Sequence, residues 1–179
     1  MPVDSAPAPE FSRPVLIEKL TAGGTRHHIE MNAEEGVALA KRFDILGVDA
    51  LSADVTLKSG PKGSVRLDGD LVAQVRQACV VTLAEVPARI AEHFSRAYAP
   101  AGRDEEEGTG DITVDLEAED PPDPLVGNSI DIGEATAEAL ALALDPYPRA
   151  PGAVFETQAE GASGAPNPFA ALAVLKDRK

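Results

Sequence analysis

The most constraining feature of the chain is a run of alternating apolar and polar residues from 64 to 78. Successive side chains of a β-strand point to opposite faces, so this period of two predicts a long strand with one buried face and one solvated face. The positions expected to face inward are Val65, Leu67, Gly69, Leu71, Ala73 and Val75. Gly69 lies in the middle of this strand, where a glycine suggests a bend or a bulge.

Two flanking segments show the same period. Residues 50–58 alternate cleanly, with Leu51, Ala53, Val55 and Leu57 on one face. Residues 86–98 alternate less perfectly, because Glu92 and Arg96 interrupt the face that carries Val86, Ala88, Ile90, Phe94 and Tyr98. We expect 64–78 and 86–98 to pair as a hairpin in which paired residue numbers sum to an odd value of about 165. That register places Arg76 beside Arg89 and Val72 beside His93.

The N-terminal part predicts two short strands and a helix. Residues 14–20 and 25–31 read as strands around a glycine turn at 22–24. Asn32 predicts the N-cap of a helix that runs to about Phe43. Its expected inner stripe, at a spacing of three, is Val37, Ala40 and Phe43.

The C-terminal part predicts a short strand at 112–116 and a second helix. Asp131 opens this helix, and Glu134 three positions later predicts a capping box. The helix is rich in Ala and Leu around most of its circumference, so we expect it to be well buried, and Pro146 stops it.

The order of these elements predicts an α+β fold rather than alternating β-α-β units. We expect an antiparallel, strongly bent or barrel-like sheet with two main helices and a C-terminal helical tail. Residues 1–10 read as a disordered arm and 11–156 as one domain with a mobile acidic loop at 101–110. Residues 157–179 read as a linker followed by a short amphipathic tail.

Charge is strongly acidic and unevenly spread. The formal net charge is −14, and 101–145 holds 14 of the 30 acidic residues with Arg103 as its only base. An acidic surface repels phosphate backbones at long range. Because the remainder of the chain is nearly balanced, that repulsion need not reach every face.

Motifs for catalysis or cofactor binding are missing from the sequence. It contains no phosphate-cradling glycine loop and no nucleophile elbow. Cys79, the single cysteine, has His93 as a candidate base but lies among apolar neighbours, so we expect a buried, unreactive thiol. A zinc site is not expected, since His27 and His28 point to opposite strand faces. We expect no catalytic residue, cofactor or metal, and no membrane segment or secretion signal, which favours the cytoplasm.

Two surfaces are candidates for partner binding. The solvent face of the predicted hairpin carries Arg66, Arg76, Arg89 and His93, which could hold phosphates or form an ordinary solvated sheet face. No aromatic stacking platform accompanies them. The acidic loops carry Glu105, Glu106, Glu107, Asp120 and Asp123. These carboxylates read as solvated loops, as contacts for a basic partner, or as a divalent-metal site that cuts RNA.

Three segments carry a family resemblance: GDLVAQVRQACVVTLAEVP (69–87), DPLVGNSIDIGEATAEALALALDPYPRAPGA (123–153) and NPFAALAVLK (167–176). They resemble the YceD family in its alphaproteobacterial version. The resemblance implies a role in processing or stability of large-subunit ribosomal RNA, without an established enzymatic activity. Many members carry a C-x-x-C pair, but here Thr82 replaces the second cysteine, which removes a zinc or redox reading.

The residues that match the family motif are Gly69, Cys79, Leu83, Asp131, Glu138, Leu142, Asp145, Pro146, Tyr147, Pro148 and Arg149. Most of them have packing or capping explanations. Glu138, Tyr147 and Arg149 do not, so we add these three to the candidate partner surface.

Two functions follow as hypotheses. The leading one is a non-catalytic ribosome-biogenesis factor that binds large-subunit ribosomal RNA, a precursor particle or a basic ribosomal protein. The alternative is a metal-dependent RNA-processing nuclease. The sequence leaves the partner, the assembly step and the oligomeric state open.

Overall fold

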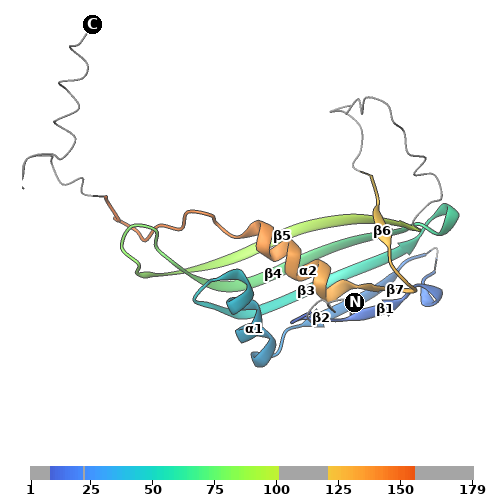
Figure 1. Cartoon of the computed structure of the whole chain (residues 1–179), viewed down its shortest axis with the longest axis horizontal. Coiled ribbons are helices and arrows are strands. Elements are labelled where there is room, and N and C mark those ends of the chain that lie inside the picture. The colour runs from blue at the N-terminus through green and yellow to red at the C-terminus, as the bar shows by residue number, and fades with distance from the viewer. Residues whose placement is uncertain (1–8, 22, 101–120, 156–179) are drawn as a thin grey trace, which may run out of the picture.

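The computed structural model describes residues 9–21, 23–100 and 121–155 (Figure 1). Its elements in chain order are β1 (Pro14–Leu16), the 3-10 turn η1 (Ile17–Lys19), β2 (Thr25–Glu30), α1 (Ala33–Phe43), β3 (Gly47–Ser59), the 3-10 turn η2 (Pro61–Gly63), β4 (Val65–Ala78), β5 (Glu85–Pro100), β6 (Asp123–Leu125), β7 (Ser129–Asp131) and α2 (Ile132–Ala143). The predicted α+β class is confirmed. The predicted strand 112–116, the loop 101–110 and the tail 157–179 lie outside the described residues.

The main sheet has five strands in the order β2-β3-β4-β5-β6, and β1 pairs with β7 in a separate two-stranded sheet. The pairs from β2 to β5 are antiparallel, whereas β6 runs parallel to β5, so the sheet is mixed rather than purely antiparallel. Both helices lie on one side of this sheet (Figure 1). The sheet is open, with β2 and β6 as its terminal strands, so the barrel-like alternative is wrong.

The predicted strand 14–20 is shorter than expected and has another partner. β1 ends at Leu16 and pairs with β7, not with β2. The Ile17 N–H donates to the carbonyl of Asn128 at 3.0 Å, and the chain then turns into η1. This pairing brings the N-terminal segment to the entrance of α2, a contact between residues far apart in the sequence.

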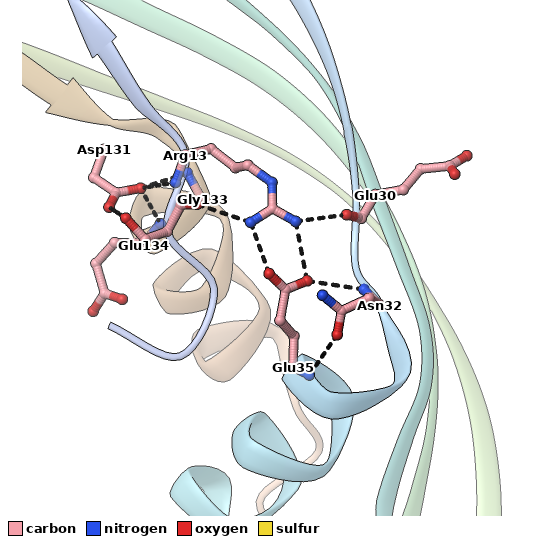
Figure 2. Close-up of polar contacts among 8 residues, drawn as sticks. Arg13, Glu30, Asn32, Glu35, Asp131, Gly133 and Glu134 are labelled. Carbon is pink, nitrogen blue, oxygen red and sulfur yellow. Dashed lines mark hydrogen bonds and ion pairs between the residues drawn. The ribbon is translucent and has the colours of Figure 1, made fainter. Parts of the chain in front are cut away.

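Helix α1 begins as predicted, and of its predicted inner stripe Ala40 is confirmed whereas Val37 is not. The Asn32 side chain accepts from the Glu35 N–H at 2.9 Å, and the Glu35 carboxylate accepts from the Asn32 N–H at 2.8 Å (Figure 2). The inner stripe is Gly36, Leu39 and Ala40, whereas Val37 is 74% exposed and Phe43 only packs at the margin of the core. The prediction for Val37 is therefore wrong by one position. A Cβ on Gly36 would lie 2.8 Å from the carbonyl oxygen of Val48, so the glycine lets this face approach β3.

Helix α2 has the predicted N-cap without the predicted capping box. The Asp131 carboxylate accepts from the N–H groups of Gly133 and Glu134 at 3.0 and 3.1 Å. The Glu134 side chain turns to Arg42 on α1 instead, with bonds of 2.9 and 2.6 Å. The second helix is well buried as expected, and it ends at Ala143, before Pro146.

The alternating strands behave as their period predicts. On β3 and β4 the buried apolar side chains are Val48, Leu51, Ala53, Val55, Leu57, Val65, Leu67, Leu71, Ala73 and Val75. The inner-facing residues of β5 are half-buried rather than buried, since β5 lies near the edge of the sheet. The core is therefore centred on β3 and β4, beneath the two helices.

In the β4–β5 hairpin each side chain lies on the predicted face of the sheet, but the cross-strand pairs differ from the predicted ones. Ala78 pairs with Glu85 beside the turn, and this turn shifts the register by two residues from the expected one. Arg76 consequently lies beside Pro87, and Val72 lies beside Ala91. A shift by two keeps every side chain on its face, whereas a shift by one would not.

Gly69 makes room for an aromatic ring and forms no bulge. Pairing runs unbroken through Gly69 and Phe94, whereas the irregularity in the sheet lies between Val48 and Ala50 on β3. A Cβ on Gly69 would lie 2.6 Å from the Cζ atom of Phe94. The glycine is therefore required by the ring that crosses it.

Replacing Gly69 by alanine is expected to lower the free energy of unfolding by about 1–3 kcal/mol, because the added methyl group overpacks the Phe94 ring. Urea unfolding measures the change. Phe94→Leu in the same chain should recover part of the loss. Gly23→Ala is the control, because a Cβ there would lie 3.9 Å from its nearest neighbour, Thr21 Oγ1. Equal effects of the two glycine substitutions would contradict this account.

Candidate partner surface

The predicted surface residues fall into two sets on opposite sides of the main sheet. Arg66 and Arg76 on β4 and Arg89 and His93 on β5 lie on the outer, solvent-exposed face. The other three belong to the helical side: Glu138 lies on α2, and Tyr147 and Arg149 follow it. The seven residues therefore do not form one site.

Arginines on the outer face are already paired with carboxylates. Arg66 Nε lies 3.1 Å from Asp68 Oδ1. Arg76 binds the Asp49 carboxylate at 2.8 to 3.0 Å and reaches Glu85 at 3.2 Å. These hydrogen bonds, first with Asp49 and then with Glu85, raise the pKa of Arg76. A phosphate would have to compete with these carboxylates, so the two arginines are poor phosphate ligands as they stand.

A row of four titratable residues crosses the same face. Asp54 on β3 lies directly opposite Asp70 on β4, and like charges in that position destabilise a sheet. His28 Nδ1 lies 3.0 Å from Asp54 Oδ1, and His93 Nδ1 lies 2.9 Å from Asp70 Oδ1. Hydrogen bonds with Glu30 and then Asp54 raise the pKa of His28. The centre of the outer face is thus a row of histidines and carboxylates.

Basic residues without an ion pair among the described residues are scattered on this face. They include Arg26 on β2, Lys58 on β3 and Arg89 on β5. Arg89 pairs across strands with Gln74, not with Arg76. The structure therefore does not gather the arginines into a continuous basic patch.

Glu138 has a structural partner that the sequence reading missed. Its carboxylate lies 2.5 Å from Arg96 Nη1 on the inner side of β5. Burial of Arg96 opposes its charge, but the attraction of Glu138 raises the pKa of the guanidinium overall. The signal was present in the sequence, because an arginine that interrupts the inner face of a strand needs a counter-charge.

Tyr147 and Arg149 point into solvent from an anchored turn. The carbonyl of Pro148 accepts from the Val80 N–H at 2.9 Å, and Pro148 itself is buried. The Asp145 side chain accepts from the Tyr147 N–H at 2.8 Å. Tyr147 is 72% exposed, so packing does not account for it, and it stays a candidate partner contact together with Arg149.

Cys79 is buried, as predicted, but its sulfur accepts several hydrogen bonds. Sγ lies 3.3 Å from the Ala150 nitrogen and 3.4 Å from the nitrogens of Val81 and Thr82. The Ala150 N–H first, and the Thr82 hydroxyl next, lower the pKa of the thiol to about 6. The sequence reading looked for neighbouring cations and missed these donors, which only the folded turn brings together.

Stability should therefore depend on pH through Cys79. A thiol whose pKa is lowered by folding makes its full contribution to the stability of the fold above the pKa of the unfolded chain, which is about 8.5. That contribution is lost as the pH falls through about 6. The difference in unfolding free energy between the wild type and Cys79→Ala should therefore grow as the pH rises from about 6 to about 8.5. Urea unfolding across this range measures it. Thr82→Val, which removes one donor, should flatten the curve, and a difference independent of pH would contradict the assignment.

Metal and membrane features are limited in the part of the chain that the structure describes. It contains no group of three or more potential metal-ligating side chains. No helix there is long and apolar enough to span a bilayer. Of the predicted acidic contacts, Asp123 lies on β6, 3.9 Å from Arg96, and the others lie outside the described residues.

Comparison with known families identifies a match over the C-terminal part of the chain. The family model described as "Large ribosomal RNA subunit accumulation protein YceD" matches residues 67–176, which is more than half of the chain. The matched range includes β5, α2 and the anchored turn that carries Tyr147 and Arg149. Neither the curated proteins nor the solved structures contain a match.

Proposed function

Because the chain belongs to the YceD family, whose model is named for accumulation of the large ribosomal RNA, we propose that it supports that accumulation as a non-catalytic assembly factor. Its direct partner in this proposal is a basic ribosomal protein of the large subunit. Such a role places the protein in the cytoplasm, where it would act on a precursor particle. In this proposal the factor delivers or holds the ribosomal protein, and the bound ribosomal protein in turn stabilises the ribosomal RNA.

The pairing of the outer-face arginines is the observation that carries the choice of partner. Arg66 and Arg76 are each held by carboxylates, so the positive charge left unpaired on this face among the described residues is the scattered set Arg26, Lys58 and Arg89. The net charge of −14 repels RNA and attracts a basic protein. Complementary charge of this kind mainly accelerates encounter and selects partners.

Pull-down from lysate, with and without ribonuclease, tests the proposal. Association with a large-subunit protein should survive ribonuclease, since the contact is between proteins. Loss of every ribosomal component after ribonuclease would instead show that RNA mediates the association.

Two charge variants then separate the surfaces. Neutralising Glu105, Glu106, Glu107, Asp120 and Asp123 to their amides should slow association about tenfold at low salt. Replacing Arg66, Arg76 and Arg89 by alanine is the counterpart and should not slow association, because it makes the protein more acidic. Direct RNA binding predicts the reverse, with the slope of log affinity against log salt falling by about 0.7 per lost contact on single strands. Circular dichroism shows whether each variant is folded.

The nuclease alternative has its own test. Purified protein incubated with precursor ribosomal RNA and Mg²⁺ is expected to leave the RNA intact. Cleavage that disappears with a chelator, and also in the variant with five neutralised acids, would support the nuclease and overturn the proposal.

A further inference from the structure

One edge of the main sheet is open along most of β5. β4 pairs with β5 from Glu85 to Tyr98, but on the other side β6 pairs only with the last three residues, Tyr98–Pro100. No strand in the described ranges covers the remaining edge of β5 (Figure 1). An exposed edge of this length is a ready template for another chain segment.

Beside this edge lies a groove between β5 and α2. It has a volume of about 430 Å³. Its apolar lining is Phe94, Ala139, Leu142 and Ala143, and its polar lining, all on β5, is Glu92, His93, Ser95 and Arg96. Phe94 is only half-buried, and Leu142 is 84% exposed. The groove therefore combines an apolar α2 side with a largely polar β5 side and unpaired strand backbone, features that suit an extended or amphipathic segment.

We propose that this β5–α2 groove binds the C-terminal segment of the same chain, residues 167–176. That segment reads NPFAALAVLK, and its larger apolar side chains are Phe169, Leu172, Val174 and Leu175. Its apolar side chains match Phe94 and the α2 side of the groove. Lys176 at the end of the segment complements Glu92, and the charge of Arg96, which also lines the groove, is already balanced by Glu138. The proposal does not depend on the identity of the ribosomal partner.

The place where the described chain ends permits this contact. The Ala150 N–H is bonded to Cys79, which follows the pair of Ala78 with Glu85 at the start of β5. From Glu85 to Phe94 the strand rises by about 30 Å. The described chain continues through a turn to Phe155, and residues 156–167 beyond it can span up to about 40 Å when extended, which is enough for the segment to reach the groove.

Covalent attachment to the same chain also favours residues 167–176 over a separate molecule as the occupant of the groove. A segment that belongs to the same chain as its binding site can be present there at an effective concentration in the millimolar range. Even a modest intrinsic affinity would then keep the groove occupied. A second copy of the chain or an unrelated peptide would have to reach comparable concentrations to compete.

Hydrogen exchange of the full-length chain, read by mass spectrometry, tests the proposal. Amides of 167–176 and of 90–97 should both be protected in the wild type. Leu142→Glu on the groove and Phe169→Glu on the segment should each speed exchange at least about tenfold in both regions. The double variant should add nothing, because both substitutions break one contact.

Val37→Glu is the matched control, since Val37 is an exposed apolar residue on α1 and lines a different groove. It should leave both regions protected. Exchange of 167–176 at the rate of an unstructured peptide in the wild type would overturn the proposal. Protection that grows with protein concentration would assign the groove to a second copy, and release by Val37→Glu would assign the segment to the α1 groove; either result overturns it.

Discussion

Replacing Phe11 by alanine is expected to lower the free energy of unfolding by about 3–5 kcal/mol, the usual cost of removing a buried phenyl ring. Phe11 is fully buried and is the largest such side chain in the core. The Arg13 guanidinium covers its ring, with 4.6 Å between Cζ and the ring centroid. The Phe11 carbonyl also faces the start of α2 so closely that a Cβ on Gly133 would collide with it. The surroundings are thus too constrained to collapse into the space left by the ring.

Phe155→Ala is the matched control for this substitution, because Phe155 is 74% exposed. Its effect should stay within about 0.5 kcal/mol. Urea unfolding of both variants gives the comparison, and similar losses would show that Phe11 is not part of the core. Phe11 lies outside the range matched by the family model, 67–176. A fragment limited to that range should therefore fail to fold cooperatively.

Replacing Asp131 by alanine is expected to cost about 2–4 kcal/mol. This carboxylate accepts from four donors. They are Ser12 Oγ at 2.5 Å, the Arg13 N–H at 2.7 Å, and the N–H groups of Gly133 and Glu134 that begin α2. Figure 2 shows Asp131 beside Arg13 and the start of α2. Loss of an N-cap alone costs about 1 kcal/mol. Donors left unsatisfied at a partly buried site cost about 1–3 kcal/mol more.

Asp131→Asn is the control that separates capping from charge. Asparagine is as good an N-cap as aspartate, so it should retain the bonds to α2. It replaces one acceptor oxygen by an amide donor, so the contact with Ser12 or Arg13 should weaken. An intermediate stability, measured by thermal unfolding, is the expected result. A loss as large as that of the alanine variant would show that the negative charge, rather than the capping geometry, stabilises this junction.

Arg13, whose N–H binds Asp131 at the start of α2, also connects the N-terminal segment to α1. Its guanidinium binds the Glu35 carboxylate at 2.7 and 3.0 Å and donates to the carbonyl of Glu30 at 3.0 Å (Figure 2). Glu35 is at the same time part of the N-cap of α1. The hydrogen bond from Arg13 is the largest influence that lowers the pKa of Glu35. One N-terminal segment therefore fixes the first turns of both helices.

The local features of this fold follow from the sequence. Alternation on 50–58 and 64–78 identified the buried face of β3 and β4, because the strand period is two whatever the partner. Asn32 and Asp131 identified the starts of both helices, because a cap acts within a few residues. These elements depend on the chain's own geometry and needed no knowledge of distant segments.

Only the tertiary structure decided which charges meet. The period of two selects a face but not a neighbour, so the turn at 79–84 set the register and moved Arg76 away from Arg89. The pairing of Arg96 with Glu138 joins a strand to a helix far along the chain. The candidate surface changed character for this reason: its arginines read as free cations in the sequence, whereas in the fold Arg66 and Arg76 are bound by carboxylates that packing places beside them.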